Sequence, residues 1–101
     1  VRNIIEPQDV DNTFRINFDL QNSPNPFFGE TKIFFSLESA ANVRLAIYDS
    51  FGREHARIYD GVLESGDHSF MWKAALLPVG MYYCTLDAGG KRKTITLSLV
   101  K

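Results

Sequence analysis

The stretch GMYYCTLDAGGKRKTITLSLVK, residues 80–101, contains two alternating runs separated by a glycine pair. In each run apolar residues recur at every second position, the period of side chains that share one face of a β-strand. They are Tyr82, Cys84 and Leu86 in the first run and Ile95, Leu97 and Leu99 in the second. Gly89 and Gly90 predict a tight reversal, because glycine readily adopts the positive φ of short antiparallel connections. The stretch therefore predicts two antiparallel strands, each with one buried face.

The same period of two recurs in five segments upstream. They are 14–20 (FRINFDL), 31–37 (TKIFFSL), 42–49 (NVRLAIYD), 53–59 (REHARIY) and 68–73 (HSFMWK). No stretch of 11 or more residues sustains apolar spacing at three and four, so no helix is predicted. The links, such as DSFGR at 49–53 with Gly52 at its turn and LLPVG at 76–80, are too short for a parallel crossover through a helix. The sequence predicts an all-β fold, an Ig-like antiparallel β-sandwich of about seven strands.

The inward positions of these segments give the expected core. Its members are Phe18, Phe35, Leu45, Ile47, Trp72, Tyr82, Leu86, Ile95 and Leu97. Cys84 lies in an apolar strand and is expected to be a small buried thiol. As the only cysteine it closes no internal disulfide, and it leaves the cellular compartment open.

Length and composition indicate a small globular domain. With 101 residues the chain has room for one domain with a single core. Its 45% hydrophobic content is too high for a disordered chain, and its net charge of -1 predicts neither nucleic-acid binding nor attraction to an anionic membrane. No apolar run approaches the roughly 20 residues that span a bilayer, so direct membrane insertion is not expected. The chain begins at Val1 without an initiator Met or a signal peptide, and we expect it to be part of a longer protein.

The segment NSPNPF at 22–27 has prolines at Pro24 and Pro26. Each fixes its own φ, favours extended geometry at the residue before it and lacks a backbone N–H. The segment therefore predicts a rigid, extended start to the β-domain. We expect residues 1–21 to be a linker or the end of a preceding domain, including a possible first strand, and residues 22–101 to be the Ig-like domain.

No set of residues predicts catalysis. We expect 60–67 (DGVLESGD) to be a hairpin loop between paired strands, which would place His55 opposite Trp72 and His68 opposite Tyr59. The two histidines would then lie at different levels of the sheet, so neither a catalytic triad nor a zinc site is predicted. The acidic residues fall mostly in loops and at outward strand positions, and no glycine motif for nucleotide phosphates is present. We expect no enzymatic activity, no metal and no cofactor.

Three tyrosines, Tyr48, Tyr59 and Tyr83, are expected to be exposed. Their rings could include a flat platform for a sugar, since tyrosine combines an apolar body with a polar tip. The basic last eleven residues could bind an acidic partner, or they could serve only to protect an edge strand. A non-cleaved Ig-like accessory, carbohydrate-binding or protein-binding module of a secreted multidomain protein is therefore an alternative interpretation.

Several motifs follow one another in a fixed order from Asn22 to Lys101. They are the SPNPF start, IYDSFGRE as strand, turn and strand, SGDHSFMWK, LPVGMYY as a turn into a strand, and a final strand that ends in Lys. In this order they resemble the C-terminal sorting domain of type IX secretion cargo (type A, the Por secretion family). The Ig-like domain of the flagellar hook-capping protein shares much of the pattern. The chain departs from the family pattern at Lys73, Met81 and Cys84.

The resemblance implies an address rather than a catalyst. Such a domain is an Ig-like sandwich at the C-terminus of a protein exported across the outer membrane of Bacteroidetes-type bacteria. Its implied partners are the secretion translocon, a sortase-like peptidase that removes the domain, and the cargo domain that precedes it in the same chain. The implied localisation is the periplasm in transit, and then the cell surface, where the cargo is joined to lipopolysaccharide, or the extracellular space.

The positions that match the family's motifs include Gly52 in the hairpin and the candidate site residues. The candidate site residues are Pro24, Asn25 and Pro26 at the start of the domain, and Gly80, Tyr82, Lys93, Leu99, Val100 and Lys101 for recognition by the translocon. A final strand could present its carboxylate and basic side chains to a receptor through edge pairing and charge. On this hypothesis, deletion of the last five residues leaves the fold largely assembled but keeps the cargo in the periplasm.

Overall fold

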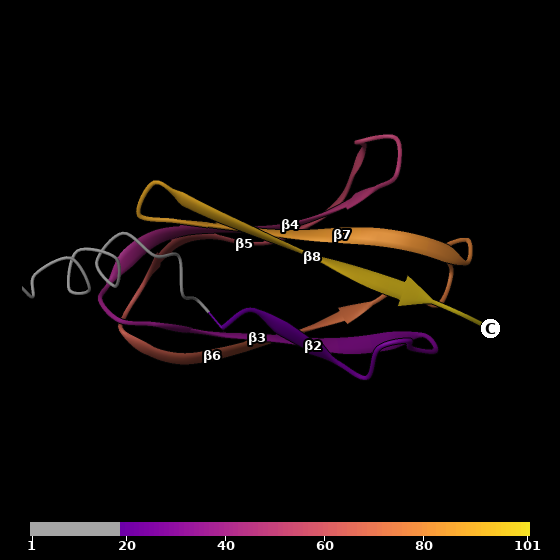
Figure 1. Ribbon diagram of the computed structural model, residues 1–101, viewed down its shortest axis with the longest axis horizontal. Coiled ribbons are helices and arrows are strands. Elements are labelled where there is room, and N and C mark those ends of the chain that lie inside the picture. Colours follow the sequence, from indigo (N-terminus) through magenta and orange to yellow (C-terminus); the bar gives the residue numbers. More distant parts are fainter. Residues whose placement is uncertain (1–18) are drawn as a thin grey trace, which may run out of the picture.

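The computed structural model describes residues 19–101 of the chain. This part contains seven strands: β2 (Gln21–Ser23), β3 (Glu30–Leu37), β4 (Ala41–Asp49), β5 (Glu54–Leu63), β6 (Gly66–Lys73), β7 (Gly80–Ala88) and β8 (Lys91–Leu99). They form two antiparallel sheets, one in the order β2-β3-β6 and one in the order β5-β4-β7-β8. The two sheets are the lower and upper layers of Figure 1. The predicted all-β, Ig-like antiparallel sandwich of about seven strands is confirmed.

The strands follow the alternating pattern of the sequence. In β7 the buried residues are Tyr82, Cys84, Leu86 and Ala88, while the residues between them are half-buried. β7 and β8 are antiparallel neighbours joined by the glycine pair, whose φ angles of 58° and 82° at Gly89 and Gly90 are those that glycine accepts most readily. The hairpin predicted for residues 80–101 is therefore confirmed.

The prediction for residues 60–67 is wrong. β5 continues through Gly61 to Leu63 and β6 begins at Gly66, so only Glu64 and Ser65 lie between the two strands. These strands are not partners, because β5 pairs with β4 and β6 pairs with β3 in the other sheet.

The expected positions of the histidines are wrong for the same reason. His68 pairs with Phe35 of β3, and Tyr59 pairs with Leu45 of β4. His55 is on β5 in the four-stranded sheet, whereas Trp72, its predicted partner, is on β6 in the three-stranded sheet. A link of two residues looks like a hairpin turn in the sequence, but here it carries the chain from one layer to the other.

The core lies between the two sheets and consists mainly of the predicted residues. Of the nine residues expected there, seven are buried: Phe35, Leu45, Ile47, Trp72, Tyr82, Leu86 and Leu97. Ile95 is only partly buried, near the open edge of β8, and Phe18 lies outside the described residues. Cys84 is fully buried as expected, and burial raises the pKa of its thiol to about 12. A thiol in this environment stays protonated and unreactive at neutral pH.

The start of the described chain is already part of the sandwich. Leu20 is buried in the core, and Gln21 pairs with Phe34 of β3. Of the segment predicted as a strand at 14–20, residues 14–18 lie outside the described residues, and the boundary between residues 21 and 22 stays a prediction. The described chain has no helix with the length and apolar character needed to cross a bilayer.

Candidate functional site

Among residues 19–101, β8 is the last strand and lies at the edge of its sheet, with β7 on one side, as Figure 1 shows in yellow and orange. Successive residues of a strand point their backbone groups alternately to its two sides. Leu97 and Leu99 lie opposite Tyr82 and Gly80 of β7. The N–H and C=O of Ser98 point the other way, away from β7, where another segment can pair with them.

The proline segment, residues 24–27, occupies this edge beside the end of β8. The N–H of Phe27 donates to the carbonyl of Ser98 at 2.8 Å, and the N–H of Val100 donates to the carbonyl of Phe27 at 3.0 Å. Phe27 and Leu99 form an isolated parallel bridge. The predicted start of the domain and its last strand, which are far apart in the sequence, are thus hydrogen-bonded neighbours.

The side chain of Asn25 extends this pairing. Its amide nitrogen donates to the carbonyl of Thr96 at 3.2 Å, and its amide oxygen accepts the N–H of Ser98 at 3.0 Å. An amide side chain carries both a donor and an acceptor, so it can take the place of a backbone residue against a strand edge. Asn25 therefore completes the contact that Phe27 begins.

The prolines bend the segment and fix it to β3. Residues 24–26 form bends rather than the extended chain that the sequence predicts, and the Ser23–Pro24 and Asn25–Pro26 peptide bonds are cis. The carbonyl of Pro24 accepts the hydroxyl of Thr31 at 2.8 Å. Thr31 is buried, so this bond satisfies a hydroxyl that would otherwise be costly to bury.

Phe27 anchors the segment in the core. Its side chain is fully buried, and its ring centroid lies 5.7 Å from that of Trp72. The sequence pattern placed Phe27 at the start of the domain, and Phe27 was not among the predicted core residues. Phe27 and Phe28 follow a proline without an alternating pattern, so the sequence does not indicate which of the two is buried.

Tyr82 has a structural position. Its ring is buried, with ring centroids of Trp72 and His55 both 5.5 Å away, and its hydroxyl donates to the carbonyl of Pro78 at 2.7 Å. A receptor cannot reach such a side chain directly. Tyr82 instead positions the turn that leads into β7.

Asp49 fixes the neighbouring β4–β5 turn. Its carboxylate accepts the N–H groups of Phe51 and Arg53 at 2.8 and 3.0 Å and the Nε of Arg53 at 2.9 Å, and it lies 2.8 Å from Nε2 of His55. Burial by itself raises the pKa of Asp49, but hydrogen bonds from His55, Arg53 and Phe51 hold it well below its usual range. The turn is therefore held by an ionised carboxylate.

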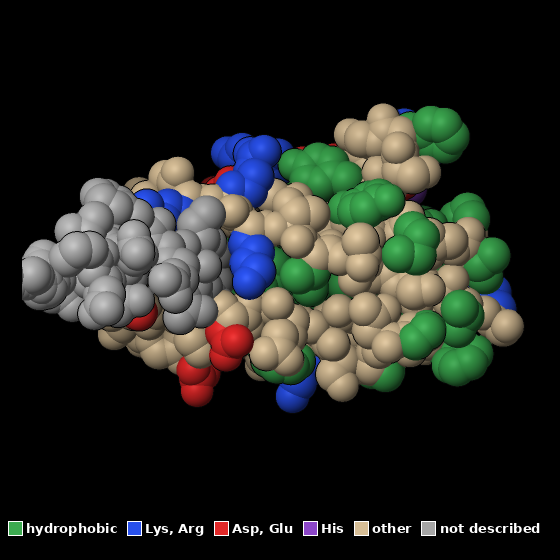
Figure 2. All heavy atoms as spheres, in the orientation of Figure 1, with side chains coloured by type: hydrophobic (Ala, Val, Ile, Leu, Met, Phe, Trp, Pro, Cys, Tyr) green, Lys and Arg blue, Asp and Glu red, His purple; other side chains and the backbone are tan. Residues whose placement is uncertain are grey.

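Five large apolar side chains are exposed around this end of the sandwich. They form the apolar rim: Phe28, Phe51, Leu76, Val79 and Met81. Leu76 is 98% exposed and Phe51 81%. In Figure 2, apolar side chains gather at the end of the molecule where the chain terminates.

The turns that meet here bring the rim together. Phe28 follows Phe27, the partner of Leu99. Leu76 and Val79 belong to the link that ends at Gly80, which is also opposite Leu99. Phe51 and Met81, with Val79, line one pocket of about 200 Å³.

Most of the predicted entry and recognition residues, but not all of them, lie close together. Pro24, Asn25, Pro26, Gly80, Leu99, Val100 and Lys101 share the end that carries the apolar rim. Within this group Leu99 is buried, Val100 is half-buried and Lys101 is exposed. Lys93 lies apart, opposite Leu86 and six residues before Leu99 along β8, roughly 20 Å away at about 3.4 Å per residue.

Within residues 19–101 no cluster of three or more His, Cys, Asp or Glu side chains could hold a metal ion. Comparison of the chain with protein-family models and with curated proteins gives no match. The functional assignment therefore depends on the motifs of the sequence and on the geometry described above.

Proposed function

We propose that this chain is a C-terminal sorting domain that directs an attached cargo protein across the outer membrane through the type IX secretion system. The observation that carries the proposal is the pairing of the proline segment with the end of β8. Two motifs from opposite ends of the sequence pattern form one hydrogen-bonded unit. A shared recognition function gives a reason for both motifs to occur in one chain.

In this proposal the translocon binds the apolar rim together with Lys101. Exposed apolar groups gathered at one place are typical of a protein-binding surface. The exposed side chain of Lys101 adds a positive charge just after the end of β8. Because β7 and the proline segment already hold the end of β8, binding there costs little additional ordering of the chain.

Cleavage by the peptidase and attachment of the cargo concern the N-terminal part of the sequence. We propose that the peptidase cuts in the part of the predicted linker that precedes the buried Leu20, and that the released cargo is then attached to the cell surface. Cleavage is a separate step from recognition by the translocon. A chain that is recognised but not cut would still export its cargo.

A reporter fusion tests the proposal. The reporter carries an N-terminal signal peptide and is followed by residues 1–101, in a bacterium that has type IX secretion. We expect the reporter at the cell surface or in the medium, and in the periplasm of a strain that lacks the translocon. An identical distribution of the reporter in the two strains would contradict the proposal.

The rim residues give a sharper version of the same assay. A triple variant with Phe28→Ser, Leu76→Ser and Val79→Ser loses exposed apolar surface while its core stays unchanged. The variant domain should fold normally, and the reporter fused to it should remain in the periplasm. Val62→Ser is the matched control, because Val62 is 60% exposed but lies on β5 outside the rim. Export of the rim variant at the level of the control would exclude the rim as the recognition surface.

A further inference from the structure

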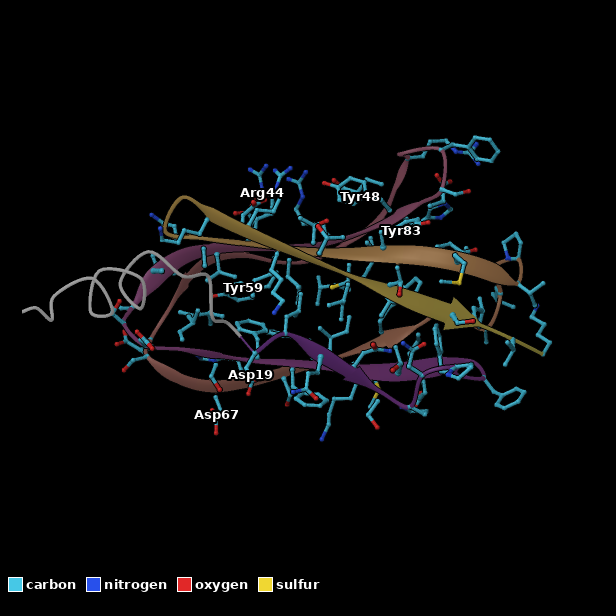
Figure 3. The ribbon with its side chains drawn as sticks, viewed as in Figure 1. Asp19, Arg44, Tyr48, Tyr59, Asp67 and Tyr83 are labelled. Carbon is cyan, nitrogen blue, oxygen red and sulfur yellow. The ribbon has the colours of Figure 1, made fainter. Side chains whose placement is uncertain are left out.

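The outer face of the four-stranded sheet is a second candidate surface, and its side chains differ in type from those of the apolar rim. Tyr48 of β4 and Tyr83 of β7 are directly opposite each other. Each alternates with buried residues and is itself half-buried, so each side chain points away from the core. Figure 3 shows them on the side of this sheet that faces away from the other layer, with Arg44 further along the same face.

Tyr59 does not belong to this face, contrary to what the sequence predicted for the three exposed tyrosines. It packs against the core with its ring centroid 5.5 Å from that of Phe70, and its hydroxyl donates to the carbonyl of Val62. Figure 3 shows it between the two sheets. The aromatic surface therefore consists of Tyr48 and Tyr83, on neighbouring strands.

Hydroxyl groups lie beside the two rings. Thr96 of β8 is opposite Tyr83, and the next pair on the same face of these strands is Thr85 and Thr94, whose hydroxyl oxygens are 3.2 Å apart. A hydroxyl can both donate and accept a hydrogen bond. The rings are thus bordered by small groups that can bond to a hydroxylated ligand.

The charges of this face cancel. Arg44 pairs with Asp60 at 3.6 Å, and Arg92 pairs with Asp87 at 2.7 Å. Arg57 pairs with both Glu54 at 3.2 Å and Asp60 at 3.6 Å. Three arginines and three acids give no net charge, so the face has no electrostatic preference for a nucleic acid or another polyanion.

A polar pocket lies on the same face, beyond the rings of Tyr48 and Tyr83. A pocket of about 370 Å³ is lined by Arg44, Asp60, Asp87 and the backbone of the β7–β8 turn at Gly89 and Gly90. Guanidinium and carboxylate groups offer several donors and acceptors at fixed positions. The face therefore combines two aromatic rings with a pocket of hydrogen-bonding groups, the usual composition of a small-molecule site.

We propose that this face binds a neutral carbohydrate chain. The apolar faces of the sugar rings would lie on Tyr48 and Tyr83, and the sugar hydroxyls would bond to Thr85, Thr94 and the charged groups of the pocket. A sugar ring presents apolar C–H groups on its faces and hydroxyls at its edge, which matches rings bordered by hydroxyls. The absence of net charge on this face selects a neutral glycan over an acidic one. The inference does not rest on the proposed function, although this face adjoins the apolar rim at Met81, which lies two positions before Tyr83 on the same side of β7.

Affinity electrophoresis of the purified chain tests the inference. The gels contain hydroxyethylcellulose, barley β-glucan, xyloglucan or galactomannan as neutral polysaccharides, and polygalacturonate as the acidic comparison. We expect at least one neutral polysaccharide to retard the chain and polygalacturonate not to. Retardation by none of the four neutral polysaccharides, or by polygalacturonate alone, would overturn the proposal.

Variants assign the binding to the tyrosines. Tyr48→Ala and Tyr83→Ala should each abolish the retardation, while Tyr83→Phe should preserve most of it because the ring remains. Tyr59→Phe is the control for a tyrosine elsewhere in the sandwich and should behave as the unmodified chain. Equal retardation of the two alanine variants and the unmodified chain would contradict the assignment.

A measurement on the unmodified chain covers the case in which an alanine variant fails to fold. The chain is treated with tetranitromethane, with and without the polysaccharide that retards it, and nitrated tyrosines are located by mass spectrometry. The polysaccharide should reduce nitration of Tyr48 and Tyr83 at least several-fold and leave Tyr59 unchanged. Equal nitration of Tyr48 and Tyr83 in both samples would overturn the proposal.

Discussion

The two halves of β8 have the same partner on one side and different surroundings on the other. From Thr96 to Val100 the strand is held between β7 and the proline segment. From Lys91 to Thr94 it is held by β7, and among residues 19–101 nothing pairs with the backbone groups of Arg92 and Thr94 that point away from β7. Within the described residues, β8 thus has a covered half and an open half.

The difference between the two halves of β8 explains how an edge strand can hold its last residues in a fixed position. An uncovered edge invites pairing with other chains, and basic side chains are a common protection. The open half carries Lys91, Arg92 and Lys93, whereas the covered half carries Leu97 and Leu99 in the core. The proline segment takes over the protective role where the strand is apolar, and it fixes the position of the last residues.

The largest expected effect comes from removing the anchor of the covered half. Phe27→Ala leaves a cavity at a fully buried position beside Trp72, and should lower the free energy of unfolding by about 3–5 kcal/mol. Phe28→Ala is the neighbouring control, since Phe28 is 71% exposed, and should change it by less than about 0.5 kcal/mol. Urea denaturation of both variants measures the contrast, and equal effects would refute the anchoring role.

A smaller effect is expected from the side chain that extends the pairing. Asn25→Ala removes two hydrogen bonds to β8 at a solvent-exposed position, and should cost about 1 kcal/mol. Asn42→Ala is a matched amide deletion at an exposed position of β4, away from the proline segment. If amide hydrogen exchange at Ser98 accelerates no more in the Asn25 variant than in the Asn42 variant, the amide of Asn25 does not hold the strand.

The ionised carboxylate of Asp49 should make the stability of the domain sensitive to acid. The pKa of Asp49 is depressed in the folded state, so its ionised form stabilises the fold above the unfolded pKa, near 4, and this contribution disappears as the pH falls toward the folded pKa. Asp49→Asn should therefore show a smaller loss of stability between pH 6 and pH 2.5 than the unmodified chain. Asp87→Asn, which breaks the exposed pair with Arg92, should not reduce that loss as much. Equal acid sensitivity in the two variants would contradict the role of Asp49.

Native-state hydrogen exchange compares the two halves without any substitution. The amides of Ser98 and Val100 are donors to the proline segment, so they should exchange more slowly than those of Arg92 and Thr94. Similar protection at all four amides would show that the two halves are equally covered.

The alternating strands could be predicted because their pattern is local. Each buried face repeats every second residue, and the turns carry glycine where positive φ is needed, as at Gly52, Gly89 and Gly90. Which strands share a sheet is not a local property. The link at Glu64 and Ser65 has the length of a hairpin turn, yet the strands it joins lie in different layers, so the histidine positions inferred from it were wrong.

The candidate site shows the same limit. The prolines and Asn25 were identified, but their contact with β8 depends on pairing between residues that are distant in the sequence. The burial of Leu97 and Leu99 argues against the expectation that the fold survives deletion of the last five residues. Such a deletion removes both leucines, so loss of export by this truncation would not separate recognition from unfolding.

A shorter truncation tests the central claim most directly. Deleting Val100 and Lys101 removes one hydrogen bond to Phe27 and leaves both core leucines in place, so the thermal unfolding midpoint should fall by only a few degrees. Export of a cargo fused to the truncated chain is measured together with the thermal unfolding midpoint. The account predicts a folded domain whose cargo accumulates in the periplasm. A folded truncated domain whose cargo reaches the cell surface as efficiently as with the intact chain would contradict it.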